Sequence, residues 1–182
     1  LKDSLNAFLM AGRLPDDTPE DVVVFLDGAN MEPLSFKLGA VTVLLINIEE
    51  ETTLRSADTY SRVSPDGVKQ KINPEIRLNL YVLFVARFRE YEESLRYLSR
   101  IIRYFQQHRL ITPQTAPSLS EKFEKLVIEL ITLPFSEQNE VWNALRVTYH
   151  PSVLYKVKMV VFEDEDSQIP AEVGEQQLRA SL

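Results

Sequence analysis

Hydrophobic and polar residues alternate most regularly along residues 76–88. Every second position of this segment is apolar, and the positions between them include Arg77 and Asn79. Side chains of a β-strand point alternately to its two faces, so this period of two predicts one long strand. A second run, residues 41–48, is rich in β-branched residues and is apolar at both sets of alternating positions. It predicts a central strand covered on both faces.

Three segments are expected to be helices, and the first two carry the three-and-four spacing of amphipathic helices. The first is already under way at the start of the chain, and Gly12 and Pro15 mark its end. The second follows the long strand and covers residues 91–105. The third covers residues 136–145, with Ser136 as the expected N-cap because its hydroxyl can accept a bond from a free helix N–H.

Three shorter apolar runs predict further strands, at residues 22–26, 126–133 and 153–162. The order α-β-β-loop-β-α-β-α-β predicts an α+β fold, a single mixed, mostly antiparallel sheet with helices packed on it. We expect one domain over residues 1–162. Residues 163–182 are acidic and have too few apolar side chains to build structure alone, so they are interpreted as a tail or arm.

A polar stretch, residues 49–71, separates the two long strands. It contains the turn sequence Ser64-Pro65-Asp66-Gly67, and its length and composition predict a functional loop rather than a core element.

Composition narrows the classes of function. The 182 residues carry a formal net charge of −7 and no Cys. An acidic protein is a poor general binder of phosphates, so a nucleic-acid partner is not expected. The lack of Cys is compatible with the bacterial cytoplasm. No apolar run approaches the roughly 20 residues of a membrane helix, and the first residues do not form a signal peptide. Because the chain begins with Leu1, natural residues are expected to precede it.

Candidate chemistry is sparse. Neither His108 nor His150 has a second ligand at metal spacing, and both are interpreted as capping or surface residues. Glu49, Glu50 and Glu51 directly follow an apolar strand, but no His, Lys or glycine-rich phosphate loop accompanies them in sequence. An interaction role is favoured over catalysis. We expect no enzyme activity, cofactor or metal.

Several stretches together resemble one family, the tube-terminating cap proteins of extracellular contractile injection systems such as the Photorhabdus virulence cassette and the antifeeding prophage. Their order and spacing carry the resemblance. They are Val43-Leu44-Leu45-Ile46-Asn47-Ile48-Glu49-Glu50-Glu51 with Thr53-Leu54-Arg55, Leu78-Asn79-Leu80-Tyr81-Val82-Leu83-Phe84, Tyr91-Glu92-Glu93-Ser94-Leu95 with Leu98-Ser99 and Phe105-Gln106, Thr112-Pro113-Gln114, Phe135-Ser136-Glu137-Gln138-Asn139 with Trp142, and Pro151-Ser152-Val153-Leu154-Tyr155-Lys156-Val157.

The resemblance implies a tail-terminator-like fold and a structural role. Such subunits form a six-fold ring on the distal end of the inner tube, stop its growth and contact the last sheath ring. The implied partners are further copies of the chain, the tube protein and the sheath protein, with assembly in the bacterial cytoplasm and no membrane required. The expected interface residues are Glu49, Glu50, Glu51, Arg55, Ile169, Val173 and Leu178. Two alternatives stay open: a tail-completion or connector ring of a phage-like particle, and a small hydrolase that uses the Glu49 cluster.

Overall fold

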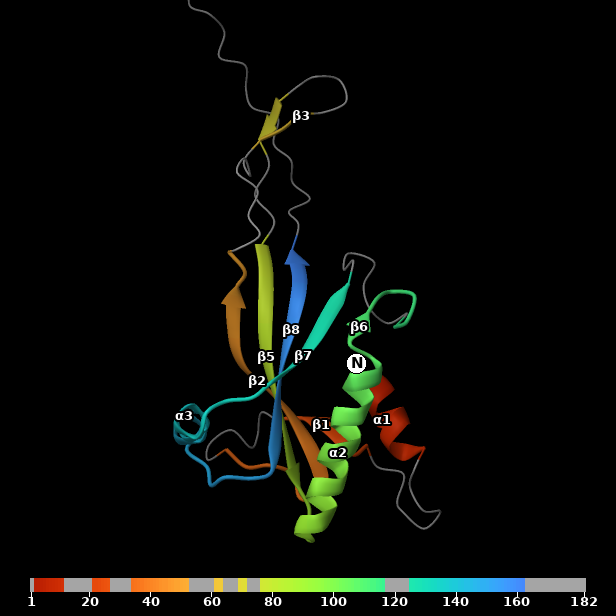
Figure 1. The fold of residues 1–182 in the computed structure, drawn as a ribbon, viewed down its shortest axis with the longest axis vertical. Helices are drawn as coiled ribbons and strands as arrows, with labels where there is room; N and C mark the ends of the chain where they lie inside the picture. Colours follow the sequence, from red (N-terminus) through yellow and green to blue (C-terminus); the bar gives the residue numbers. More distant parts are fainter. Residues whose placement is uncertain are drawn as a thin grey trace, which may run out of the picture.

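A six-stranded sheet organises the chain in its computed structural model (Figure 1). The structure describes residues 2–11, 21–26, 34–52, 61–63, 69–71, 76–116 and 125–162. The helices of these residues are α1 (Lys2–Met10), α2 (Tyr91–Gln107) and α3 (Phe135–Leu145). The strands are β1 (Val23–Phe25), β2 (Ala40–Glu50), β3 (Ser61–Val63), β4 (Lys69–Lys71), β5 (Ile76–Arg87), β6 (Leu110–Ile111), β7 (Leu126–Ile131) and β8 (Ser152–Phe162).

The strand order of the large sheet is β1-β2-β5-β8-β7-β6, and β3 and β4 form a separate two-stranded sheet. β1 runs parallel to β2, whereas every other pair of neighbouring strands is antiparallel. The predicted α+β fold with a mixed, mostly antiparallel sheet is therefore confirmed. None of the helices in the described ranges combines the length and the apolar character that crossing a membrane requires.

Side chains of β5 point alternately to the two faces of the sheet, so the core consists of two layers. Phe84 and Ala86 pack in a cluster with α1 and α2. Leu83 and Val85 point to the opposite face and pack in a second cluster. The first cluster is aromatic at its centre, where the ring of Phe105 lies 5.5 Å from that of Phe84 and 4.7 Å from that of Tyr155. Burial raises the pKa of Tyr155 to about 12.

The second layer is closed by α3, whose Trp142 is 5% exposed and meets Phe36 edge to face. The N-cap prediction for this helix was wrong. Pro134 occupies the cap position and its carbonyl accepts the Gln138 N–H at 2.9 Å, so Ser136 lies inside the first turn. Proline leaves no N–H unpaired at this position, but it offers no side-chain acceptor, and the helix start accordingly has no side-chain cap bond.

Two predictions about the middle of the chain need correction. The predicted loop, residues 49–71, begins too early, because β2 continues through Glu49 and Glu50, and β3 and β4 pair within the loop. Residues 41–48 are not covered on both faces along their whole length. Val41 and Thr42 are buried, but Leu45 is 51% and Ile48 is 54% exposed. The pattern of residue types along the sequence identifies the strand, but it does not show how much of the strand other elements cover.

Candidate interface at the acidic end of the sheet

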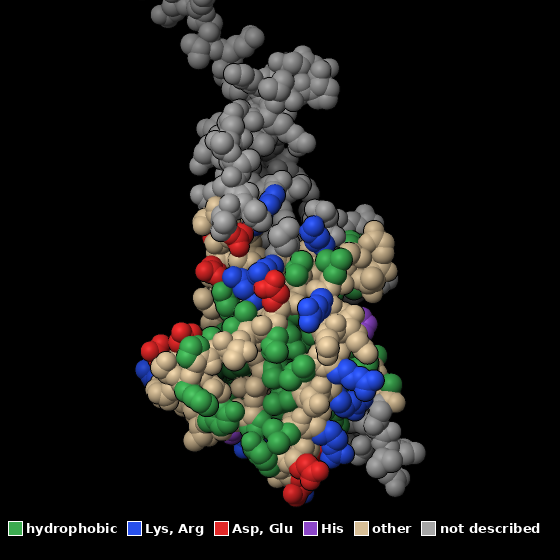
Figure 2. All heavy atoms as spheres, in the orientation of Figure 1, with side chains coloured by type: hydrophobic (Ala, Val, Ile, Leu, Met, Phe, Trp, Pro, Cys, Tyr) green, Lys and Arg blue, Asp and Glu red, His purple; other side chains and the backbone are tan. Residues whose placement is uncertain are grey.

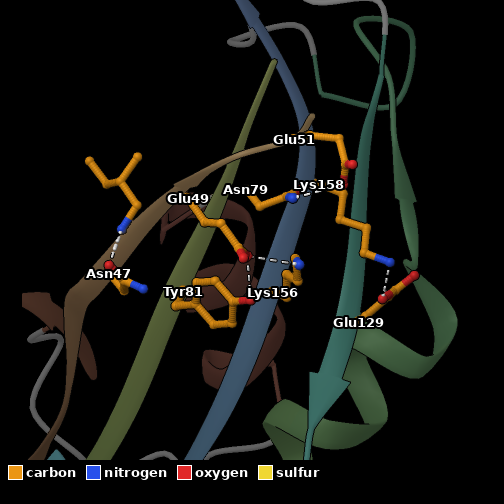
Figure 3. A network of polar contacts seen from close by, with 9 residues as sticks. Asn47, Glu49, Glu51, Asn79, Tyr81, Glu129, Lys156 and Lys158 are labelled. Carbon is orange, nitrogen blue, oxygen red and sulfur yellow. Dashed lines mark hydrogen bonds and ion pairs between the residues drawn. The ribbon is translucent and has the colours of Figure 1, made fainter. Parts of the chain in front are cut away.

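A polar network crosses four strands beyond the apolar layer that α3 covers (Figure 3). The Tyr81 hydroxyl of β5 donates to Glu49 Oε2 of β2 at 2.7 Å. Lys156 Nζ of β8 donates to the same oxygen at 3.2 Å and lies 5.2 Å from the centre of the Tyr81 ring. One carboxylate oxygen thus accepts bonds from two strands and fixes the β2 end against its neighbours.

Two further contacts extend this network along the sheet. Lys158 of β8 forms an ion pair of 2.6 Å with Glu129 of β7. Asn79 of β5 is only 2% exposed, and its Nδ2 donates to Glu51 Oε2 at 3.1 Å. The backbone of Glu51 is also held, since its N–H donates to the Arg77 carbonyl at 2.8 Å. The acidic segment therefore follows the sheet to its end.

The contacts within this network favour the charged forms of Glu49 and Lys156. The pKa of Glu49 lies below its ordinary value because the Tyr81 hydroxyl and then Lys156 stabilise the carboxylate. The pKa of Lys156 is raised, first by its bond with Tyr81 and then by Glu49, against an opposing effect of burial. A general acid at neutral pH needs a raised carboxyl pKa, so this arrangement favours an ion pair over proton transfer.

Replacing Tyr81 by phenylalanine should raise the pKa of Glu49 toward its ordinary value, because the main bond to the carboxylate is lost. A depressed folded-state pKa stabilises the fold above the unfolded pKa, and this stabilisation disappears as the pH falls through the folded value. Wild-type protein should therefore lose more stability on acidification than the variant. Carbon NMR of the Glu49 carboxyl group measures the pKa directly.

Tyr91→Phe is the matched control, since Tyr91 is 64% exposed on α2. It should leave the Glu49 titration unchanged. An unshifted Glu49 pKa in Tyr81→Phe would contradict the role assigned to the hydroxyl.

An apolar surface adjoins the network at the outer side of β2. Leu45 and Ile48 project into solvent there. A groove of about 730 Å³ opens between this strand and the end of α3. Its lining is mostly apolar and consists of Leu26, Leu34, Leu44, Leu45, Ile46, Asn47, Tyr81, Leu133, Val141, Ala144, Leu145, Arg146 and Leu154. Figure 2 shows charged side chains gathered over the upper part of the sheet and apolar ones on the surface below them. Exposed apolar surface next to charge is typical of a protein contact.

The family model described as the Pvc16 N-terminal domain matches residues 1–175. The chain belongs to this family. Among solved structures, its fold matches the PVC sheath/tube terminator of an extracellular contractile injection system in the extended state, with a TM-score of 0.53 and 14% identity. That match covers 99% of this chain and 62% of the terminator. The anti-feeding prophage tube-terminating cap matches with a TM-score of 0.47 and 13% identity, over 73% of this chain and 47% of the cap.

A comparison with curated protein sequences gives no significant match. The chain spans less than two thirds of the length of the solved proteins that it resembles. The predicted family is confirmed by the match to the Pvc16 N-terminal domain, and the predicted terminator-like fold is confirmed by the shared fold.

The structure brings together three of the predicted interface residues. Glu49 and Glu50 end β2 and Glu51 follows directly. The other predicted contacts, at Arg55, Ile169, Val173 and Leu178, lie outside the described residues.

The two histidines bond locally. His108 caps α2, where Nδ1 lies 2.8 Å from the Tyr104 carbonyl and the two rings stack. His150 Nδ1 lies 2.9 Å from the carbonyl of Tyr149, and its ring packs against Phe36. Among the described residues, no group of three or more acidic or histidine side chains could hold a metal ion.

Sequence reasoning missed the partners of the acidic cluster. Tyr81 is 32 residues from Glu49 and Lys156 is 107 residues from it. No local pattern marks such a pair, because only the strand register brings them together. Short turns between strands can fix the register of their pairing. Long connections join these strands instead, so the sequence leaves their register undetermined.

Proposed function

We propose that this chain is a structural, non-enzymatic subunit of the cap that ends the inner tube of a contractile injection system. Its copies form a six-fold ring on the distal tube end, stop polymerisation and anchor the last sheath ring. The observation that carries the proposal is the match to the Pvc16 N-terminal domain over residues 1–175, supported by the fold shared with a sheath/tube terminator.

The geometry suits a ring subunit in two ways. The sheet, with α1 and α2 on one face and α3 on the other, makes a body with two packed layers. Exposed side chains lie beside the acidic end of β2, where Leu45 and Ile48 are about half exposed. A closed ring needs two different surfaces on each copy, and a rigid body holds them at a fixed angle.

The alternative of a small hydrolase is disfavoured by the state of Glu49. Its carboxylate is held ionised by Tyr81 and Lys156, and both histidines bond neighbouring carbonyls instead. A tail-completion or connector ring of a phage-like particle would use a similar subunit. The length of particles made without this chain separates that function from termination.

Deletion of the chain should make tubes and sheaths irregular in length or unstable, because nothing then closes the growing end. Electron microscopy of purified particles measures the length distribution. Reintroducing the wild-type chain should restore a single length. Particles of normal length that contract normally without the chain would rule out termination.

We also propose where the subunit makes its contacts. Glu49, Glu50, Glu51 and Arg55 lie at a subunit or tube contact. Residues 163–182 form an arm beyond the domain of residues 1–162, anchored on a neighbour by Ile169, Val173 and Leu178. An acidic arm gains its contacts only on assembly, which offsets the entropy of ordering it.

Charge reversal of Glu49, Glu50 and Glu51, and separately truncation after Phe162, should each leave a folded chain that assembles poorly. Glu49 and Glu50 are exposed, and exposed charges contribute little to stability but strongly affect the choice of partner. Native mass spectrometry of the ring and microscopy of particles measure assembly, and circular dichroism measures folding.

The control is charge reversal of three acids on the helices, Glu92, Glu137 and Glu140, all of them exposed. This variant changes net charge equally and should assemble. Normal assembly of the first variant would remove the acidic cluster from the interface, and normal capping by the truncated chain would do the same for the arm.

A further inference from the structure

β2 keeps a long outer edge with which no strand of the described residues pairs. β1 pairs only with Val41, Thr42 and Val43, near the start of β2. β2 then continues to Glu50, paired on its inner side with β5. In Figure 1 this second half of β2 stands at the margin of the sheet.

The backbone of this edge presents donors to the outside. Val41 N–H donates outward to the Val22 carbonyl at 2.7 Å, so by alternation the N–H of Leu45 also points outward. A register shift follows between Leu45 and Asn47. Beyond it, the Glu51 N–H points inward to Arg77, which leaves the N–H of Ile48 facing out.

The outward N–H of Ile48 is bonded by a side chain instead of a strand. Asn47 Oδ1 accepts it at 2.9 Å, in an exposed position (Figure 3). A single rotation of the Asn47 side chain would release this donor to a carbonyl of an added strand. The local bond satisfies the edge in the isolated chain and is easily exchanged.

The side chains around this edge are apolar on both faces. Leu45 and Ile48 pair with Val82 and Leu80, which places them on the face of the first core cluster, and both are about half exposed. The groove of about 730 Å³ borders the edge and reaches under the end of α3. Natural sheet edges are commonly protected by charged side chains, proline or a β-bulge. This part of β2 has a register shift between Leu45 and Asn47 but no charge or proline before Glu49.

We infer that the outer edge of β2 from Leu44 to Glu50 is a strand-addition site for an extended segment of another protein chain. That segment has apolar residues beside Leu45 and Ile48, and lysine or arginine where it passes Glu49 and Glu50. Backbone bonds supply affinity in this mode of recognition, and the groove selects side chains.

The charge of this edge argues against one candidate for the added strand, the acidic arm of a second copy of the chain. Residues 163–182 carry six acids and one arginine, and they would place Glu163, Asp164, Glu165 and Asp166 beside an edge that already ends in three acids, of which Glu49 is paired with Lys156. Like charges at such an edge repel, so the acidic arm of a second copy does not fit here. A segment that carries lysine or arginine fits this edge.

The test uses the full chain and a labelled ten-residue peptide in which valine alternates with threonine and two lysines follow. Binding should slow amide hydrogen exchange at Leu45 and Ile48, as measured by NMR. Ile48→Pro removes the outward donor without touching the ladder to β5, and should weaken binding by about tenfold or more. Ile48→Ala removes the side chain but keeps the donor, and should weaken binding less.

Leu45→Lys adds a charge at the edge and should also weaken binding by about tenfold or more, whereas Leu38→Lys, at a leucine of similar exposure, should not weaken it. Thermal melting confirms that each variant is folded. The inference is overturned by a peptide that does not bind, by binding without slower exchange at these amides, or by equal binding of a peptide interrupted with proline. The experiment needs neither ring nor particle, so its result is separate from the test of tube termination.

Discussion

Phe105→Ala should lower the free energy of unfolding by about 3–5 kcal/mol, the usual cost of truncating a buried phenylalanine. Phe105 is 2% exposed and its ring contacts those of Phe84, Tyr104 and Tyr155. The substitution would leave a cavity between α2 and two central strands, and several aromatic contacts would be lost together. Urea denaturation followed by circular dichroism measures the change.

Phe135→Ala is the matched control, because Phe135 is 91% exposed at the start of α3. Its effect on stability should stay within about 0.5 kcal/mol, as for most surface positions. Equal losses in the two variants would show that the described core does not carry the stability of the domain.

Asn6→Leu should lower the free energy of unfolding by about 2–4 kcal/mol, because it leaves two buried backbone groups without partners. Asn6 Nδ2 donates to the Val23 carbonyl at 3.0 Å, and Asn6 Oδ1 accepts the Val23 N–H at 2.7 Å. The side chain thus acts as a further partner for the three-residue strand β1. Leucine is of similar size but can make neither bond.

Urea denaturation gives the loss of stability, and amide exchange at Val23 should become faster in the same variant. Asn139→Leu, at an exposed position of α3, serves as the control and should change neither quantity. Unchanged exchange at Val23 would contradict the role of Asn6 in holding β1.

Both predictions concern the body of the domain, whereas the proposed contacts lie on its surface. Variants of Phe105 and Asn6 should therefore reduce assembly only as far as they reduce the folded fraction. Variants of the acidic end of β2 should reduce assembly in a chain that stays folded. Measuring folding and assembly on the same preparations separates the two classes.

Local sequence patterns were enough to establish the elements and the class of fold. The period of two along β5 and the three-and-four spacing of α2 each follow from burying one face of a regular element, which is a local requirement. The family resemblance likewise rests on the order of residues along the chain and needed no coordinates.

The order of the strands, the register of their pairing and the extent to which other elements cover β2 depend instead on contacts between distant parts of the chain. Tyr81 and Lys156 meet Glu49 because the sheet places β5, and beyond it β8, next to the acidic end of β2. The apolar run that suggests a strand covered on both faces is half exposed at Leu45 and Ile48, because neither core cluster extends to these two side chains. Composition records how apolar a strand is, but only the positions of its neighbours determine which part of it remains open to a partner.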